Sequence, residues 1–380
     1  MHVIGNTHHK IQYRIGKINM KIIIVTNMPA PYRIPIFEKI TQKYHDDFSV
    51  IYSVRTEPNR SWNLGNLNFK HIFLKENIIA KTEGLSFVHN NPDIWKHLKE
   101  MKPDVIITTG YNPTFLYAWI YSLIYRKKHI VMTDGWIESE KKLSWVHRLV
   151  RILVLNTSHA FIGASKNSLD LYRSYGMKDQ KLFQSHLCVE NINFNNDKTF
   201  EDRKYHLMFS GQFTDRKLPF FFAEVAKAVS KKIPHLKVLI LGNGPLKDDF
   251  FTLLQEYNID FHYAGFVSQD KLPSYYANTK LFLFPTLLDA WGVVVNEAMA
   301  SGTPVITTPF AGVIDDLIIN GKTGYFLQID TAIWSNKIIK LLDSPDQWNK
   351  LSRESKTHVQ NYNFDIATKG ILDAINYANK

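Results

Sequence analysis

The sequence has few of the features that mark a secreted or membrane-embedded protein. It contains a single cysteine, Cys188, among 380 residues, which excludes an intramolecular disulfide and favours a reducing compartment such as the cytoplasm. No apolar run approaches the ~20 residues that a membrane-spanning helix needs. The longest, residues 113–125, is closed by three basic residues. Residues 1–19 are polar and His-rich, without the apolar centre of a signal peptide, so we expect a flexible extension there.

Acidic residues are scarce in one half of the chain only. Residues 1–190 contain 26 Lys and Arg against 15 Asp and Glu, whereas residues 191–380 contain 20 of each, so the whole formal charge of +11 lies in the first half. A basic domain beside a neutral one predicts an anionic partner; the alternative is a solubility feature without a partner. No aromatic-basic RNA-binding motif accompanies the charge, so nucleic acid is not the expected partner.

Strands and helices alternate twice along the chain. Short β-branched runs without polar alternation, such as residues 21–26, 103–109 and 235–241, are typical of strands covered on both faces. The polar, Asn-rich stretch 191–204 separates the two series and is the expected linker. The fold class is therefore α/β, with two Rossmann-like domains at 20–190 and 205–360 facing each other across a cleft. We expect residues 361–380 to form a helix that packs back toward the first domain.

The most informative segment is FPTLLDAWGVVVNEAMASGTPVI, residues 284–306. A buried strand ends at residue 285, and a loop carrying Asp289 leads into a helix near residue 293, with Glu297 one turn inside it. Such a turn directs free N–H groups and the positive end of the helix dipole at a ligand, for which a pyrophosphate is well suited. Asp289 and Glu297 would then accept hydrogen bonds from sugar hydroxyls. The alternative makes Asp289 a helix N-cap and Glu297 a surface residue.

Glycine turns follow three other strands of the second domain. In FSGQFTDRK, residues 209–217, Gly211 lets a ligand approach the backbone. Lys217 is expected to open the next helix, where a cation opposes the dipole unless an anion is present; a solvated Lys is the alternative. Gly242 and Gly244 form a turn after residue 241, and the segment YAGFV, residues 263–267, could contact the edge of a nucleobase.

In order along the chain, these segments resemble glycosyltransferase family 4 of the GT-B fold, a retaining family also called glycosyl transferases group 1. The family's Gly-Arg-Leu-x-x-x-Lys corresponds to residues 211–217, and its Gly-x-Gly-Pro to residues 242–245. Its paired glutamates correspond to Asp289 and Glu297, the second followed by Ala-Met-Ala-Ser-Gly-Thr-Pro-Val. The match covers residues 205–327, and some polysaccharide-building members resemble the first domain near residues 29–33.

The resemblance implies roles for individual residues. Lys217 would bind the donor diphosphate, Glu297 the nucleotide ribose and Asp289 the hydroxyls of the donor sugar. Other donor-binding candidates come from the same loops: Gly211, Gln212, Gly242, Gly244, Phe266, Val267, Ala290, Trp291, Gly292 and Val293. Gln212 departs from the family pattern because it replaces an Arg and removes one cation from the phosphate site. Asp289 is one methylene shorter than the usual Glu.

The resemblance further implies that the departing phosphate takes the acceptor proton, so that the protein works by electrostatics and positioning. The sequence contains no Asp-x-Asp, and we expect no metal or other cofactor. On the first domain, Asp134 is the candidate for contacting the acceptor or the donor sugar, with a helix or turn cap as the alternative. Glu138 and Arg33 are further acceptor-side candidates. The catalytic set is thus Asp134, Lys217, Asp289 and Glu297.

Residues 141–155, KKLSWVHRLVRILVL, combine basic side chains with Trp145 and several leucines. This composition suits an anionic membrane interface, although an ordinary amphipathic core helix would look similar. With the charge asymmetry, it predicts a cytoplasmic protein on the inner face of the cell membrane. Its partners would be a nucleotide-sugar donor (UDP- or GDP-sugar) and a lipid-linked saccharide acceptor of lipopolysaccharide or capsule synthesis. A sugar-nucleotide epimerase of the same fold and a catalytically silent nucleotide-sugar-binding protein are the alternatives.

Overall fold

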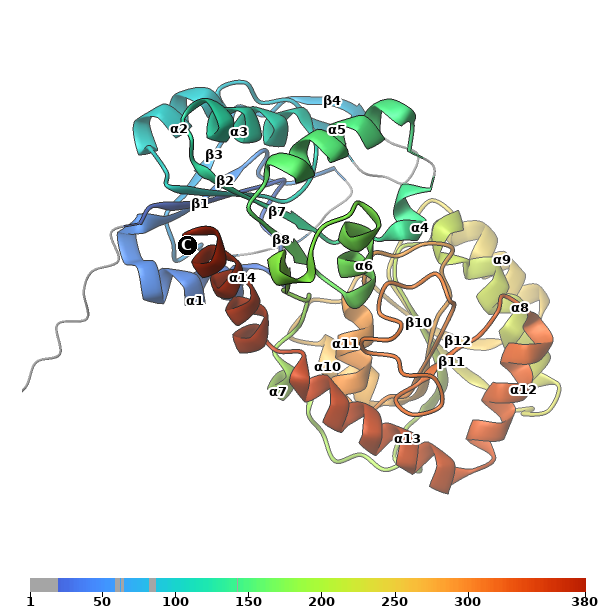
Figure 1. Cartoon of the computed structure of the whole chain (residues 1–380). Coiled ribbons are helices and arrows are strands. Elements are labelled where there is room, and N and C mark those ends of the chain that lie inside the picture. Colours follow the sequence, from blue (N-terminus) through green and yellow to red (C-terminus); the bar gives the residue numbers. More distant parts are fainter. Residues whose placement is uncertain (1–19, 59–61, 63–64, 82–86, 142) are drawn as a thin grey trace, which may run out of the picture.

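The computed structural model describes residues 20–58, 62, 65–81, 87–141 and 143–380. Two parallel sheets form two α/β domains, and the chain returns to the first domain at its C-terminus (Figure 1). The predicted N-terminal extension and Lys142 lie outside the described residues. None of the helices in the described part of the chain combines the length and apolar character needed to cross a bilayer.

The N-terminal sheet has seven parallel strands in the order β3-β2-β1-β6-β7-β8-β9. The strands are β1 (Ile22–Thr26), β2 (Phe48–Tyr52), β3 (His71–Phe73), β6 (Val105–Thr108), β7 (Lys128–Thr133), β8 (Ala160–Gly163) and β9 (Leu182–Gln184). The helices are α1 (Ile34–Tyr44), α2 (Ile94–Met101), α3 (Pro113–Ile124), α4 (Ile137–Glu140), α5 (Trp145–Thr157) and α6 (Lys166–Ser174). A small antiparallel pair, β4 (Ile78–Lys81) and β5 (Phe87–His89), was not expected from the sequence.

Strand β1 shows why these runs are apolar throughout. Ile22 and Ile24 pack with α1 in one buried cluster, whereas Ile23 and Val25 pack with α2 and α3 in another. Successive side chains of a strand point to opposite faces, so a strand covered on both faces has no polar alternation. The continuous apolar runs in the sequence therefore identified this sheet correctly.

The C-terminal sheet has six parallel strands in the order β12-β11-β10-β13-β14-β15. The strands are β10 (Tyr205–Ser210), β11 (Lys237–Leu241), β12 (Asp260–Gly265), β13 (Thr279–Phe284), β14 (Val305–Thr307) and β15 (Tyr325–Phe326). The helices are α8 (Pro219–Ser230), α9 (Lys247–Glu256), α10 (Leu272–Ala277), α11 (Val293–Ala300), α12 (Thr331–Leu342) and α13 (Pro345–His358).

The chain crosses between the domains twice. On the first crossing, within the predicted linker, residues 191–194 form the short helix α7 (Asn191–Phe194). On the second, the chain runs from α13 into the last helix, α14 (Phe364–Ala378). Helix α14 buries an apolar stripe in the core shared by β1, β2 and α1, and it appears beside α1 in Figure 1. The first domain is therefore built from both ends of the described chain.

A hydrogen-bonded contact joins the domains near α6. The backbone N–H of Lys166 donates to Oδ2 of Asp316 at 2.7 Å, and the Gln184 side chain donates to Oδ1 of Asp316 at 2.8 Å. Asp316 is buried, and burial raises the pKa of its carboxyl group. The Tyr362 hydroxyl donates to the same carboxylate at 3.3 Å, so one buried acid connects α6, β9 and the segment before α14.

Candidate functional site

The candidate site lies at the carboxyl ends of β10 and β13, the two central strands of the C-terminal sheet. Because the two strands are parallel neighbours, the loops that follow them leave the sheet side by side. The carbonyl of Arg216, in the first loop, accepts hydrogen bonds from the Leu287 N–H at 2.8 Å and from the Thr286 hydroxyl at 3.1 Å. The two loops identified in the sequence are therefore directly connected.

Three charged side chains meet where these loops join. Oδ2 of Asp289 accepts a hydrogen bond from Nζ of Lys217 and another from Nη1 of Arg216 at 2.8 Å. Lys217 and Asp289 are largely buried, whereas about a third of the Arg216 side chain is exposed (34%). Two cations face one carboxylate, so the cluster carries a net positive charge.

The charge state of Asp289 follows from these partners. Burial alone would raise its pKa, but the neighbouring Lys217 and Arg216 outweigh burial and lower the pKa to about 2. Asp289 is therefore ionised at neutral pH. Its other oxygen accepts the Trp291 N–H at 3.2 Å. The alternative in which Asp289 caps the following helix is wrong, because the N-cap of α11 is Gly292.

A segment that the sequence analysis did not single out holds Asp289 in place. The Asp289 N–H donates to the carbonyl of Phe310 at 3.0 Å, and its carbonyl accepts the Gly312 N–H at 2.8 Å. A Cβ atom on Gly312 would overlap the carbonyl oxygen of Ala290, so this approach requires glycine. In the sequence, the only signal for this segment is Gly312 itself, a glycine in the loop after β14.

The position of Lys217 differs from the sequence prediction. It belongs to a 3₁₀ turn, Asp215–Lys217, and Leu218 then adopts a left-handed conformation (φ 52°) before α8 begins at Pro219. The left-handed residue separates this turn from α8, so Lys217 precedes the helix and does not open it. Lys217 therefore does not oppose the dipole of α8 from inside its first turn; it points to Asp289, with its ammonium 4.2 Å from the centre of the Phe284 ring.

Helix α11 begins beside this cluster. Gly292 has φ 93°, and a Cβ there would lie 2.6 Å from the Phe284 ring, so only glycine fits. The following residues leave the first N–H groups of α11 without partners inside the helix. Trp291 is buried and donates its indole N–H to Asn296 at 2.8 Å, which fixes the loop against the helix. Ala290 and Val293 flank this turn.

Glu297 lies one turn into α11 and is buried (6% exposed). The hydroxyl of Tyr276, at the end of α10, donates to its carboxylate at 2.8 Å. Burial raises the pKa of Glu297 to about 7, partly offset by that hydrogen bond. The alternative of a surface residue is therefore wrong for Glu297. Tyr276, which no sequence motif indicated, is its principal partner.

The remaining donor-side candidates surround the ends of β10, β11 and β12. A Cβ on Gly211 would meet no atom within 4 Å, so space adjoins this residue. Gly242 (φ 115°) packs so closely on Gly211 that a side chain would overlap its carbonyl oxygen, and Gly244 similarly contacts Phe213. Close packing therefore requires glycine at both positions, independently of any ligand. Beyond β12, Phe266 is 63% exposed and Val267 is partly buried.

On the first domain, the structure brings Arg33 and Asp134 together. Nη2 of Arg33 donates to Oδ1 of Asp134 at 2.8 Å, and Nη1 lies 3.3 Å from both oxygens of Ser185. Arg33 is buried, whereas 38% of the Asp134 side chain is exposed. The carboxylate therefore pairs with a cation rather than capping a helix. Glu138 is apart from them and forms an ion pair with Lys141 at 2.7 Å.

The loops of the first domain meet α11 on this side. The rings of His186, which follows β9, and Trp291 stack with centroids 6.5 Å apart, and Tyr32, in the loop after β1, packs in the cluster that contains Trp291. The side chain of Asn296 donates to the carbonyl of Leu187 at 3.4 Å. The carboxyl-end loops of the two sheets therefore face each other around α11.

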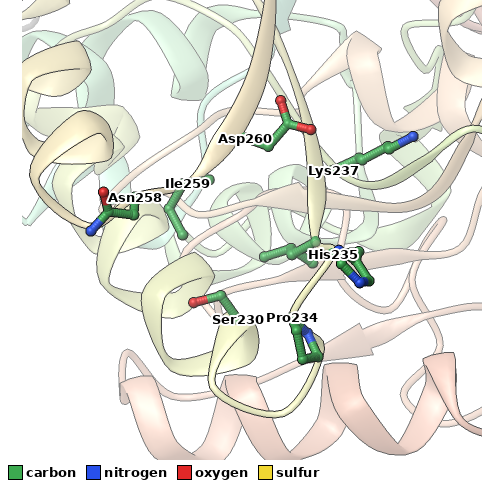
Figure 2. Close-up of a pocket in the computed structure, with 8 residues that line it drawn as sticks. Ser230, Pro234, His235, Lys237, Asn258, Ile259 and Asp260 are labelled. Atoms are coloured by element: carbon green, nitrogen blue, oxygen red, sulfur yellow. The ribbon is translucent and has the colours of Figure 1, made fainter.

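Two hollows in the described residues lie elsewhere. One, of about 150 Å³, is lined by residues that include Ser230, His235 and Asp260 (Figure 2). It lies at the start of β11 and β12, at the opposite end of the strands from Lys217. Ligand pockets typically exceed roughly 300 Å³. A larger hollow of about 570 Å³ lies between residues 196–203 and α13, near the C-terminal end of α11. Neither belongs to the candidate site.

Comparison with solved structures identifies the class of protein. HepE of Anabaena, in complex with UDP, matches with a TM-score of 0.75 over 94% of this chain and 100% of that chain, at 14% identity. A likeness at this identity concerns the fold alone. The matching structures are GT-B glycosyltransferases with two Rossmann-like domains, so the predicted GT-B fold is confirmed.

The sequence comparison agrees with the resemblance found in the sequence. Residues 190–358 match the family model of the glycosyl transferases group 1. Sulfoquinovosyl transferase SQD2 of Arabidopsis thaliana is 30% identical over 39% of this chain and 29% of its own. The capsular polysaccharide biosynthesis glycosyltransferase CapM of Staphylococcus aureus is 29% identical over 36% of each chain. The chain thus spans about a third of these relatives. Both relatives are named as enzymes that transfer sugar.

Proposed function

We propose that this protein transfers a sugar from a nucleotide-sugar to a saccharide acceptor with retention of configuration. The observation that carries the proposal is the arrangement along α11: the Lys217–Arg216–Asp289 cluster at its start and the buried Glu297 one turn inside. A cation cluster beside free helix N–H groups suits a diphosphate, and the two acids on either side suit the hydroxyls of a sugar and a ribose. Because HepE was solved with UDP, UDP-sugars are the first donors to test.

In this proposal the bond between the anomeric carbon and the diphosphate oxygen breaks as the acceptor oxygen bonds to the same face of the sugar. The acceptor proton passes to the departing phosphate, which leaves with the electron pair of the broken bond. Lys217 and the N–H groups at the start of α11 stabilise the developing negative charge. Asp134, oriented by Arg33, contacts the acceptor or the donor sugar from the first domain. No metal takes part.

The outer face of α5 supports a membrane-associated acceptor. Five apolar side chains that share one side of α5 are exposed: Trp145, Val146, Leu149, Ile152 and Leu153. Trp145 is 74% exposed, and the exposed Arg148 lies one position before Leu149 on the same helix. An apolar stripe beside a basic side chain suits an anionic membrane surface. Arg151 contributes little, because it is largely buried in an ion pair with Glu140.

We therefore place the protein on the inner face of the cell membrane, adding sugar to a lipid-linked saccharide of a surface polysaccharide. The similarity to CapM, which is named for capsular polysaccharide biosynthesis, supports that class of acceptor.

The test measures nucleotide release from UDP-, GDP-, ADP- and CMP-sugars in EDTA, with and without a bacterial lipid extract. Release from one donor that the extract stimulates is the expected result. An epimerised nucleotide-sugar formed without acceptor would instead indicate an epimerase, and nucleotide binding without any release would indicate a silent binding protein. Dependence on Mg²⁺ or Mn²⁺ would contradict the metal-free mechanism.

Two variants connect that activity to the site. Lys217→Ala and Glu297→Ala should each lower the release rate by on the order of a hundredfold, since each removes a charged contact to the donor. Lys237→Ala, at the opposite end of the strands, is the matched control and should retain full activity. Full activity in both site variants would exclude this site from the reaction.

A further inference from the structure

We propose that Arg216 supplies the second cation of the diphosphate site and contacts the phosphate that bears the sugar. The inference rests on the proposed function and deepens it. The resembled family carries an Arg at the position of Gln212, which is neutral here. Without another cation, Lys217 would be the only cationic side chain of this loop to meet a group that carries two to three negative charges.

Arg216 is placed to fill that role. Its backbone carbonyl is held by the N–H of Leu287 and the hydroxyl of Thr286, so its Cα sits firmly at the junction of the two loops. Its Nη1 donates to the carbonyl of Leu288 at 2.7 Å and to Asp289 at 2.8 Å. These are two of the five N–H donors of a guanidinium. With 34% of the side chain exposed, the guanidinium can contact a ligand through its remaining donors.

The positions of Asp289 and Glu297 relative to α11 indicate which phosphate Arg216 contacts. Arg216 contacts Asp289, the acid proposed to face the donor sugar. Glu297, proposed to face the ribose, lies a helical turn further on and pairs with Tyr276 instead. A donor spanning the two acids would bring its sugar-bearing phosphate to Arg216 and its ribose-bearing phosphate nearer Glu297.

Charge balance gives Asp289 a second role. In the donor-free protein its carboxylate neutralises part of the charge of Lys217 and Arg216. A bound diphosphate would bring a larger negative charge to the same two cations and weaken their hold on Asp289, leaving that carboxylate able to accept hydrogen bonds from sugar hydroxyls. Arg216 thus couples phosphate binding to the release of the sugar-binding acid.

The experiment compares a nucleoside diphosphate with its monophosphate by isothermal titration calorimetry on the full-length protein. The nucleoside is whichever of UDP, GDP and ADP binds best. Arg216→Ala should lower the affinity for the diphosphate by about ten- to a hundredfold, as expected for a charge-assisted hydrogen bond. The affinity for the monophosphate should change less than about threefold. Arg216→Lys keeps the positive charge but lacks the planar guanidinium, so its affinity for the diphosphate should lie between those of the parent and of Arg216→Ala.

Moving the positive charge to another position of the same loop distinguishes phosphate binding by Arg216 from a purely structural role. In Arg216→Ala, adding Gln212→Arg returns the family's Arg and should restore most of the diphosphate affinity. Arg353→Ala, an exposed change on α13, is the matched control. The inference is overturned if Arg216→Ala binds the diphosphate as well as that control does, or loses affinity for both nucleotides by the same factor. If the unchanged protein binds none of the nucleotides, the proposed donor site itself fails.

Discussion

At the scale of single residues, ionising the buried Glu297 carboxyl group lowers the stability of the folded protein. Its pKa is raised to about 7 from an ordinary value of 4.5, mainly by burial. Between these values the folded protein holds a proton that the unfolded chain releases, so stability falls as pH rises from about 4.5 to 7. Glu297→Gln removes this cost and keeps an oxygen for the Tyr276 hydroxyl. We expect the variant to be more stable than the parent by about 1–3 kcal/mol at pH 8 and nearly equal at pH 4.5.

Chemical denaturation of both proteins at the two pH values measures this difference, and nucleotide titration should show weaker binding by the variant. A residue retained for binding at the expense of stability shows this combination. Glu201→Gln, which makes the same change at an exposed acid ahead of β10, is the control and should show no such pH-dependent gain. Destabilisation by Glu297→Gln at pH 8 would contradict the claim that the ionised Glu297 lowers the stability of the folded protein.

The site residues differ in how far the sequence could predict them. Lys217, Asp289 and Glu297 stand in motifs whose spacing reflects strand–loop–helix geometry, so their segments could be recognised in the sequence. Tyr276 and Phe310 could not, because each reaches the site from another segment through a single contact. The sequence also gave no reason to distinguish Arg216 from a solvated arginine, because its role depends on the loop after β13.

At the scale of elements, the exposed apolar face of α5 predicts binding to an anionic membrane surface. Trp145→Ser with Leu149→Ser removes two exposed apolar side chains from its outer face. Because neither contributes to the core, stability should change by less than about 1 kcal/mol. Binding to vesicles that contain phosphatidylglycerol should fall on the order of tenfold, since apolar burial contributes to interfacial binding. Cosedimentation measures the bound fraction.

The control changes two exposed apolar residues on the other domain, Ile329→Ser with Ile333→Ser, which are 36% and 46% exposed. These lie at the start of α12, away from α5 (Figure 1), and should leave vesicle binding within about twofold of the parent. Equal losses in the two variants, or no binding by the parent protein, would remove α5 as a membrane contact.

Elements buried on both faces were the easiest to predict. Strands β1, β6 and β11 follow from the continuous apolar runs at 21–26, 103–109 and 235–241, and α11 begins at Val293 as predicted because a glycine precedes it. Helix α13 was not predicted: most of its residues are polar, and only Trp348, Leu351 and Ser355 are buried. The pair β4–β5 is short and lies outside the main sheet, so its pattern was too brief to detect.

At the scale of the whole molecule, Asp316 connects the domains through a carboxylate whose oxygens both accept hydrogen bonds. In Asp316→Asn the amide must turn its NH₂ group toward one of the donors, Lys166 N–H or Gln184. The expected loss is about 1–3 kcal/mol in the free energy of unfolding. Hydrogen exchange of the Lys166 amide should also accelerate. The adjacent, exposed Asp315→Asn is the matched control. Unchanged exchange at Lys166 would show that Asp316 does not hold the domains together.

The return of α14 to the first domain also has a consequence for how the protein is made. The core around β1 and α1 includes side chains of α14 from Phe364 to Ala378. A ribosome exposes that helix only after the whole second domain has been translated, whereas the strands of the second sheet are complete by β15 and the core around them ends at Tyr362, before α14 begins. The domain synthesised first is therefore the one finished last. A stop codon directly after residue 362 would leave the first domain with an open apolar face, while the second could still fold.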